Sequence, residues 1–310
     1  MTMPQTADVE HTARVFVGEE ALASERVADV LARSRGLAYG DGVFETMRAH
    51  CGAIHWWPAH WARAERGAER LGIPLPSRAR VEAERDALLR AAPDGVVKWT
   101  LLRGAGARGY APDPEAPPLW LLSAHPVPTP LARGLRLRWC ETRLAMQPRL
   151  AGIKHCNRLE QVLARAEWAR LDADEAACDD GLMRDADGRA VAATSANLFV
   201  HRDGGWLTPS IERCGIAGVC RAWAMEALDA REAELSVEAV ESADALVLSN
   251  AVRGILPVAR LGDARWPSRH PAANEAIHCL AAAHPAFADA PMAEARNAAT
   301  ADNAGIGDNA

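Results

Sequence analysis

The spacing of apolar residues in the first half of the chain predicts both helices and strands. From Trp57 to Leu71, apolar residues recur every three or four positions with arginine and glutamate opposite them, which predicts an amphipathic helix over 58–71. A second helix is predicted over 78–92, and the Pro-Asp-Gly turn at 93–95 marks its end. Short apolar runs predict strands at 13–17, 96–103 and 119–125, and the segment 37–48 is predicted to be a glycine-rich turn that runs into a strand.

The second half of the chain has the same mixture of periods. Strands are predicted over 135–140, 175–184, 191–201 and 245–249, and an Asp-Ala-Asp-Gly turn separates the middle two. Helices are predicted over 157–171, 218–228 and 271–283. The helix over 157–171 carries its apolar side chains on one face, and these are Leu159, Val162, Leu163 and Ala166.

The order of these elements limits the possible architectures. Helices and strands alternate without a regular repeat of strand, helix and strand, which indicates an α+β fold rather than a doubly wound parallel sheet. A chain of 310 residues is long enough for two domains. The proline-rich stretch 126–134 is the expected linker between a smaller α+β domain over 12–125 and a larger domain over 135–285. The ends, 1–11 and 286–310, contain few large apolar residues and are expected to be disordered.

Charge and composition argue against several classes of function. The net charge of −6 is mild and the arginines are interleaved with acidic residues, so we expect no nucleic-acid partner. No apolar run approaches the roughly 18 residues that span a bilayer, and the first residues lack the features of a signal peptide. We therefore expect no membrane association and a cytoplasmic protein. The seven cysteines and ten histidines show no metal-ligand spacing, so we expect reduced thiols and no metal site.

Only two of the 35 basic residues are lysines, and one of them has the setting of a catalytic amine. Arginine keeps its charge near neutral pH, whereas lysine attacks a carbonyl once its pKa is lowered. Lys154 follows Gly152-Ile153 and precedes the predicted helix over 157–171, so we expect it in a loop or strand end where it is partly desolvated. Lys98 has no such setting, and we interpret it as a lysine without a catalytic role.

Three glycine-rich segments could hold a ligand, although each also has an ordinary structural explanation. The segment 215–218 precedes a predicted helix, whose first N–H groups bind phosphate well, but such glycines more often serve packing or capping. The segment 103–108 places two arginines on a loop, where they either clamp carboxylates or stay solvated. The glycines around the aspartate of 40–42 are, on their own, only a turn signal.

Five motifs follow one another along the chain. They are Tyr-Gly-Asp-Gly-Val-Phe-Glu-Thr at 39–46, Arg-Gly-Ala-Gly-Ala-Arg-Gly-Tyr at 103–110, Leu-Ala-Gly-Ile-Lys-His-Cys-Asn-Arg-Leu-Glu-Gln-Val at 150–162, Ala-Asn-Leu-Phe at 196–199 and Cys-Gly-Ile-Ala-Gly-Val at 214–219. In this order, and over about 13–260, the chain resembles the fold-type IV pyridoxal-phosphate enzymes. The run Arg-Leu-Glu-Gln-Val after the lysine is typical of the aminodeoxychorismate lyases of that family and not of its branched-chain aminotransferases.

The resemblance implies a two-domain α+β fold with pyridoxal 5′-phosphate between the domains, held mainly by the larger one. It implies a homodimer in which a loop of the partner closes the site. The implied reaction is an elimination that converts 4-amino-4-deoxychorismate into 4-aminobenzoate and pyruvate, a step of folate biosynthesis. A D-amino-acid or branched-chain aminotransferase of the same fold is the first alternative, and a homologue that binds the cofactor without catalysis is the second.

The resemblance also implies roles for ten positions. Lys154 corresponds to the lysine that binds the cofactor covalently and then moves protons. Thr46 corresponds to a threonine that assists proton transfer as pyruvate leaves, where the aminotransferases have residues of the glycine or valine type. The remaining positions correspond to contacts with the cofactor phosphate, which are Arg63, Val219, Cys220, Asn250 and Ala251, and to contacts with the dicarboxylate substrate, which are Arg108, Arg103 and Tyr110.

One position departs from the pattern of the family. Its members have a glutamate bonded to the cofactor's ring nitrogen, five residues before the asparagine of Ala-Asn-Leu-Phe, and this chain has Ala192 there. Three explanations are open: the hydroxyl of Thr194 or Ser195 takes over, an acid from elsewhere does so, or catalysis is weakened or lost. The candidate acids are Glu167, Asp179, Asp185 and Asp187.

Overall fold

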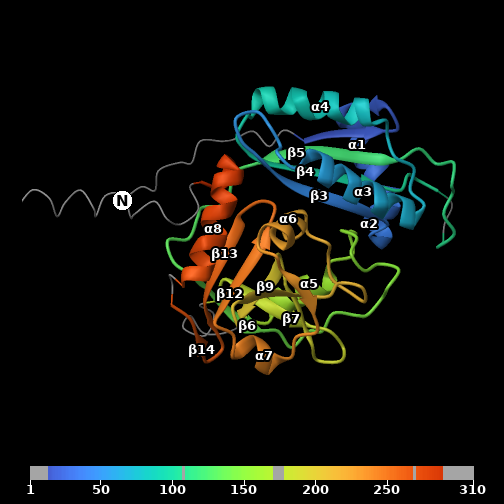
Figure 1. Ribbon diagram of the computed structural model, residues 1–310. Coiled ribbons are helices and arrows are strands. Elements are labelled where there is room, and N and C mark those ends of the chain that lie inside the picture. The colour runs from blue at the N-terminus through green and yellow to red at the C-terminus, as the bar shows by residue number, and fades with distance from the viewer. Residues whose placement is uncertain (1–12, 107–108, 170–177, 268–269, 289–310) are drawn as a thin grey trace, which may run out of the picture.

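The computed structural model of the protein describes residues 13–106, 109–169, 178–267 and 270–288 (Figure 1). The chain forms two sheets, one from each half. In Figure 1 the N-terminal half, coloured blue to green, lies above the C-terminal half, coloured green to red. The expected disorder of 1–11 and of 289–310 concerns segments outside the described residues.

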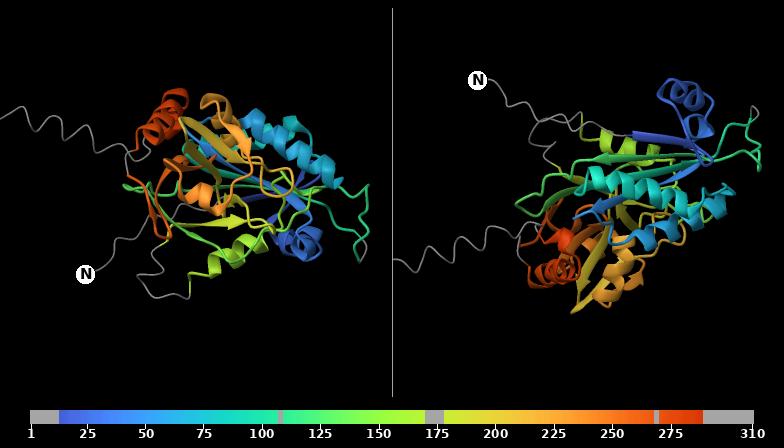
Figure 2. Two further views of the ribbon diagram at one scale, coloured as in Figure 1. Left: turned by 60° about the horizontal axis from the view of Figure 1, so that its bottom comes forward. Right: turned by 90° about the horizontal axis from the view of Figure 1, so that it is seen from above.

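The N-terminal half forms a five-stranded antiparallel sheet. Its strands are β1 (Ala13–Val17), β2 (Glu20–Ala21), β3 (Gly42–Ala49), β4 (Gly95–Leu102) and β5 (Leu119–His125), and its helices are α1 (Ser24–Ala32), α2 (Arg35–Tyr39), α3 (Trp57–Leu71) and α4 (Arg78–Ala91). The strands lie in the order β2-β1-β5-β4-β3. Helices α3 and α4 share one hydrophobic core with the sheet, and α1 packs on a smaller apolar cluster (Figure 2).

Helix α3 shows how the predicted apolar pattern builds this layer. Its buried apolar side chains are Trp57, Trp61, Ala64 and Ala68, which recur at helical spacing. The indole of Trp61 stacks on that of Trp99 in β4, with ring centroids 5.2 Å apart. Gly72 ends the helix with a φ of 63°, a conformation that glycine adopts without strain. The same inward face also carries the polar residues His60 and Arg63, which are buried.

The C-terminal half forms a larger sheet that closes on itself. Its strands are β6 (Leu135–Trp139), β7 (Asp180–Arg184), β8 (Ala190–Ala193), β9 (Asn197–Arg202), β10 (Gly205–Pro209), β11 (Arg231–Ala233), β12 (Ala245–Asn250), β13 (Gly254–Leu261) and β14 (Ala264–Arg265). The order is β11-β10-β9-β12-β13-β6-β7-β8, and β8 also pairs with β9. The strands from β9 to β8 therefore form a ring.

Five helices accompany this ring in the described part of the C-terminal half, and the alternation of side chains along the strands explains how they pack. They are α5 (Leu159–Ala166), α6 (Val219–Ala227), α7 (Val237–Glu241), α8 (Pro271–Ala283) and the short 3₁₀ helix Pro285–Phe287. Along β9, Leu198 and Val200 point into the core inside the ring, and Phe199 points to the core shared with α6 and α8. Successive side chains of a strand face opposite sides, so one strand serves two cores.

Most predicted elements are confirmed, and the differences have local causes. The strand 119–125 and the helix 271–283 match the structure, whereas 191–201 is not one strand, because a turn separates β8 from β9. The strand predicted from 175 is described only from Asp180. The tail was expected to be disordered from 286, but Phe287 is buried and stacks on Trp56, so the ordered chain extends further. The strands β10 and β13 were not predicted.

Helix α5 differs from its prediction in extent and in environment. It begins at Leu159 and ends at Ala166, and its apolar face is exposed to solvent. The exposed fractions are 75% for Leu159, 58% for Val162 and 59% for Leu163. The opposite side, at Ala164, is the buried one. An apolar stripe at helical spacing thus does not pack on the core of its own chain.

The two halves meet along β3, which is the edge strand of the first sheet. Val43 of this strand forms an antiparallel bridge with His155, and the backbone N–H of Phe44 donates to the carbonyl of Lys154 at 2.9 Å. The segment 126–134 connects β5 of the first sheet to β6 of the second. The division into two domains at this segment stays a prediction, and it is consistent with the two separate sheets. Within the described residues, no helix has the length and apolar character needed to cross a membrane.

Candidate active site

A cavity of about 820 Å³ lies where the two halves meet. Its walls come from β3, from α3, from the segment around Lys154 and from the turns after β8 and β12. Six of the ten predicted site residues line it, namely Thr46, Arg63, Lys154, Val219, Asn250 and Ala251. Residues far apart in the sequence therefore converge on one space large enough for a cofactor with a substrate.

The segment that carries Lys154 is bonded to both halves. The carbonyl of Lys154 accepts from Phe44, and its Nζ lies 4.5 Å from the centre of the Phe44 ring. Gly152, with a φ of 80°, is bonded to the carbonyl of Gly215 at 3.0 Å, which fixes the start of the segment. Burial, followed by the charge of Arg63, lowers the pKa of Lys154 to about 8. About a tenth of the amine is therefore uncharged and nucleophilic at pH 7, far more than for a solvent-exposed lysine.

A buried charged cluster lies next to this lysine and fixes Arg63. The carboxylate of Glu45 accepts from Arg63 Nε at 2.8 Å and pairs with a second guanidinium nitrogen. It also accepts from His60 Nδ1 at 2.6 Å, and Arg63 Nη1 donates to the carbonyl of Ala217 at 3.0 Å. All three charged or polar side chains of the cluster are at most 5% exposed. The arginine is thus locked in one orientation at the cavity wall.

The charges of this cluster follow from the contacts. Burial alone would raise the pKa of Glu45, but the charge and hydrogen bonds of Arg63, together with those of His60, lower it to about 2. Burial lowers the pKa of His60 in spite of Glu45, so this imidazole is neutral and donates through Nδ1. Glu45 and His60 were not predicted as site residues. Their signal in the sequence is that Glu45 adjoins Thr46 and that His60 is three residues before Arg63 on one helical face.

The wall next to Arg63, at the start of helix α6, has the features of a phosphate site. Helix α6 begins at Val219, and no side chain caps its first N–H groups. At Gly218 an added Cβ would meet Asn197 Oδ1 at 2.1 Å, so the close approach of these two segments requires glycine. Asn250 Oδ1 accepts from the N–H groups of Val252 and Arg253 at 3.0 and 2.8 Å and shapes the neighbouring loop. Cys220 is fully buried behind this wall.

The predicted substrate contacts are placed differently. Arg103 is a correction: it is 4% exposed, and it donates to Asp41 at 2.9 Å and to the carbonyls of Leu71 and Gly72 at 2.5 Å. Its guanidinium therefore joins the end of α3 to the turn before β3 and does not line the cavity. Arg108 lies outside the described residues. Tyr110 is 84% exposed and also does not line the cavity.

Other cationic side chains line the cavity instead. These are Arg158, Arg165 and Arg253, with His155 beside them. Arg158 Nε donates to the carbonyl of His155 at 3.0 Å, and its burial lowers the pKa of its guanidinium. Arginine at this wall offers bidentate hydrogen bonds to a carboxylate.

Ala192 also lines the cavity, and the structure shows which acid is close to this wall. Asp180 is 5% exposed and accepts from the N–H and hydroxyl of Thr194, and from Ser195 Oγ at 2.6 Å. Arg165 pairs with it at 3.2 Å. None of the acids that the sequence suggested lines the cavity: Glu167, Asp179, Asp185 and Asp187 are bonded elsewhere. Asp180 was not predicted, because its contacts cross from β7 to the turn after β8.

Fold and site together define a class of protein. A family model described as amino-transferase class IV matches residues 42–261, so the chain belongs to this family. Members of this fold type use pyridoxal phosphate, and the predicted α+β fold of type IV is confirmed.

Similarity to individual proteins narrows the class. The chain is 35% identical over 234 residues to the aminodeoxychorismate lyase of Vibrio harveyi, which covers 72% of this chain and 84% of the relative. The crystal structure of 4-amino-4-deoxychorismate lyase from Pseudomonas aeruginosa superposes with a TM-score of 0.77 at 40% identity, over 86% of this chain and 98% of that one. The branched-chain aminotransferase of Escherichia coli, at 20% identity and a TM-score of 0.72 over 85% of this chain and 91% of that one, shares the fold.

Proposed function

We propose that this chain is an aminodeoxychorismate lyase, which converts 4-amino-4-deoxychorismate into 4-aminobenzoate and pyruvate with pyridoxal 5′-phosphate as cofactor. The observation that carries the proposal is a half-buried lysine of lowered pKa that shares one cavity with a threonine hydroxyl. The similarity to two proteins named as this lyase supports it. We assign the reaction to folate biosynthesis and the protein to the cytoplasm.

The cavity fits the cofactor by the chemistry of its walls. The uncharged amine of Lys154 is suited to hold the aldehyde carbon, and Arg63 with the uncapped start of α6 is suited to hold the phosphate. The cavity-lining residues Asn250 and Ala251 complete this end. When bound, pyridoxal phosphate supplies an electron sink for the carbon that carries the substrate's amino group.

Two residues of the chain, Lys154 and Thr46, carry out the proton transfers of the proposed reaction. Lys154 Nζ takes the proton from the substrate ring carbon that carries the amino group. Thr46 Oγ1, or a water that it holds, protonates the departing enolpyruvyl group, which leaves as pyruvate. Arg158 and Arg253, from the second half, are placed to bind the carboxylates of the substrate. Aromatisation of the ring supplies much of the driving force.

The decisive experiment is an assay of the purified protein loaded with pyridoxal phosphate. It measures 4-aminobenzoate and pyruvate released from 4-amino-4-deoxychorismate, in equal amounts if the proposal holds. Amino transfer from a D- or branched-chain amino acid to a keto acid, in place of this release, would assign the chain to the aminotransferases. Bound cofactor with neither activity would identify a homologue that binds without catalysis.

Replacing Thr46 with valine is expected to lower kcat by about 100-fold, because valine keeps the shape but removes the hydroxyl that transfers the proton. KM should change little, since the cavity keeps its volume. Thr46→Ser, which restores the hydroxyl, serves as the control and should recover most of the rate. Equal kcat for wild type and Thr46→Val in steady-state assays would remove Thr46 from the mechanism.

Installing a glutamate at Ala192 is expected to leave turnover unchanged. We assign the contact with the ring nitrogen to the hydroxyls of Thr194 and Ser195, which are backed by the buried carboxylate of Asp180. The measurement compares kcat of wild type and Ala192→Glu, with Asp180→Asn as a companion that should lower kcat. A large gain in the glutamate variant would show instead that the ring nitrogen limits the wild-type enzyme.

We also propose that the protein is a homodimer. The exposed apolar face of α5 supports this, because contiguous apolar surface marks contacts with other chains. Leu159 and Val162 of this face also line the cavity, so a partner bound here would cover part of the cavity mouth. Light scattering of the purified chain is expected to give twice the mass of one protomer, and a monomer at assay concentrations would contradict the proposal.

A further inference from the structure

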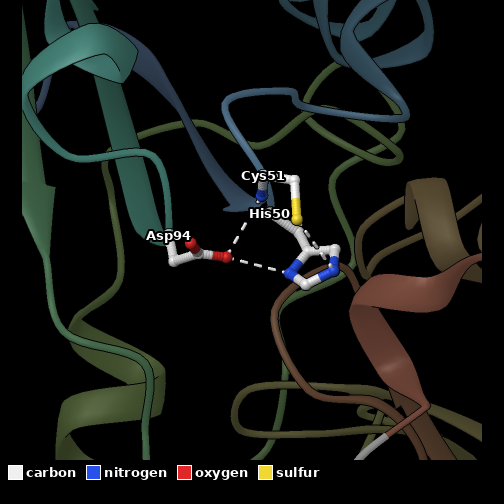
Figure 3. Close-up of side chains that lie close together, drawn as sticks. All are labelled: His50, Cys51 and Asp94. Atoms are coloured by element: carbon white, nitrogen blue, oxygen red, sulfur yellow. Dashed lines mark hydrogen bonds and ion pairs between the residues drawn. The ribbon is translucent and has the colours of Figure 1, made fainter.

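An exposed cysteine lies beside a histidine and an aspartate, outside the cavity described above. His50 and Cys51 follow β3, and Asp94 lies in the turn before β4 (Figure 3). Cys51 Sγ is 3.5 Å from His50 Nε2, and His50 Nδ1 is 2.9 Å from Asp94 Oδ1. The three side chains thus form a row of thiol, imidazole and carboxylate.

The contacts determine how the row is protonated when the imidazole is neutral. Asp94 Oδ1 accepts from the backbone N–H of Cys51 at 3.1 Å, and this bond, then those of His50, keep the pKa of Asp94 below its usual value. An ionised carboxylate only accepts hydrogen bonds, so Nδ1 of His50 carries the proton. Nε2 is then the acceptor, and it faces the thiol. This is the arrangement in which an imidazole takes a proton from a nucleophile.

The backbone holds the thiol in place at a conformational cost. His50 and Ala53 exchange backbone hydrogen bonds of 2.9 and 3.0 Å across the two residues between them, which both have positive φ, 50° at Cys51 and 75° at Gly52. Hairpin turns of this kind favour asparagine, aspartate or glycine at the first of these positions. The N–H of Gly52 also donates to the carbonyl of Pro93 at 2.9 Å, which ties this turn to that of Asp94.

A metal ion fits these groups less well than proton transfer does. One ligand atom from each residue lies within 4.8 Å of the others, which is close enough for all three to approach one cation. However, the sulfur and the carboxylate contact opposite nitrogens of the ring. An ion bound to one nitrogen would have to break the contact that the other nitrogen makes.

We propose that Cys51 is a reactive thiol that forms mixed disulfides with small disulfide molecules. His50 Nε2 takes the proton of the thiol, and Sγ attacks one sulfur of the disulfide. The new bond joins Cys51 to that sulfur, the old S–S bond breaks, and the other half leaves as a thiolate with the electron pair. Asp94 stabilises the resulting imidazolium. The disulfide is itself the oxidant, so no further reagent is needed.

The chain contains a matched control for this chemistry. Cys279 is also exposed and is also preceded by a histidine, His278, but both lie in helix α8. Consecutive residues of a helix do not face each other, so this pair lacks the geometry of the turn. The same two residue types, in the same order, therefore occur once with the contact and once without it.

The test treats the full-length protein with 2-hydroxyethyl disulfide, quenches samples with acid and quantifies the mixed disulfide on each cysteine by peptide mass spectrometry. Cys51 is expected to react about tenfold or more faster than Cys279, because the thiolate is the reactive form. His50→Gln and Asp94→Asn should each bring the rate of Cys51 close to that of Cys279 and leave Cys279 unchanged. Melting temperatures of both variants show whether the turn stays folded.

Three results would overturn the proposal. One is an equal rate for the two cysteines in the wild type. Another is a Cys51 rate that His50→Gln does not change, since this variant removes the base but leaves the hydrogen bond from the Cys51 N–H to Asp94 in place. The third is stoichiometric zinc on the purified protein that His50→Gln removes, because the cluster would then be a metal site. The lyase assay is independent of all three, so the two proposals fail separately.

Discussion

Replacing Lys154 with alanine is expected to lower the release of 4-aminobenzoate by at least about 10⁴-fold, because the proposed mechanism uses this one amine both to hold the cofactor and as the base. The burial of this amine and its pKa of about 8 are what fit it for both tasks. Lys154→Arg should be as inactive, since a guanidinium keeps its proton. The measurement is initial-rate product release from wild type and both variants, each supplied with pyridoxal phosphate.

The second lysine of the chain provides the control. Lys98 is exposed on β4 and does not line the cavity, so Lys98→Arg should keep wild-type turnover. Borohydride reduction of the loaded protein, followed by peptide mass spectrometry, should place the cofactor on Lys154 in wild type and in Lys98→Arg. Cofactor trapped on Lys98, or turnover retained by Lys154→Ala, would contradict the assignment.

Replacing Glu45 with glutamine is expected to lower the free energy of unfolding by about 3 to 5 kcal/mol, because it leaves the buried guanidinium of Arg63 without a counter-charge. Affinity for pyridoxal phosphate should fall as well, since Glu45 orients Arg63 at the cavity wall. Urea denaturation and a cofactor titration measure the two effects. Glu65→Gln, at an exposed position of α3, should change stability by no more than about 0.5 kcal/mol.

The effect of Glu45 depends on pH with a definite sign. Its pKa is about 2 in the folded protein and near 4.5 in an exposed carboxyl, so the folded state favours the ionised form. Its contribution to stability is fully present above pH 4.5 and is lost as the pH falls from there toward 2. The difference in stability between wild type and Glu45→Gln should therefore shrink over this range. A difference that stays constant in this range would show that the charge of Glu45 is not what stabilises the fold.

The sequence predicted best those features that depend on neighbouring residues. The helix over 58–71 followed from a local period, and the structure finds it buried as that period requires. The apolar stripe of α5 has the same kind of period, yet it is exposed, because a period shows which residues share a face and not what covers that face. The strand β13 was missed because its partners, β12 and β6, lie on either side of it in space and not in its local pattern.

The site was predictable to the extent that single motifs mark it. Lys154 stood out by its rarity and its setting, whereas Glu45, His60 and Asp180 were missed because their contacts join different elements. Arg103 is the opposite case, a residue that a motif predicted at the site and that does not line the cavity. Its motif suggested a carboxylate clamp, but the backbone carbonyls at the end of α3 take its donors, and no local pattern predicts that approach.

The placement of Lys154 between the halves has a thermodynamic consequence. The segment 152–156 is hydrogen-bonded to β3 on one side and to 215–217 on the other, so it joins the N-terminal half to the C-terminal half. In the proposed binding mode the cofactor contacts Arg63 from one half and α6 from the other, so it binds only while the two halves are joined. When the cofactor is present at about 1,000 times its dissociation constant, its binding stabilises the joined state of the two halves by about 4 kcal/mol. The segment that carries the proposed catalytic lysine thus also joins the two halves. The free energy needed to separate the halves therefore becomes a measure of how tightly the cofactor is bound.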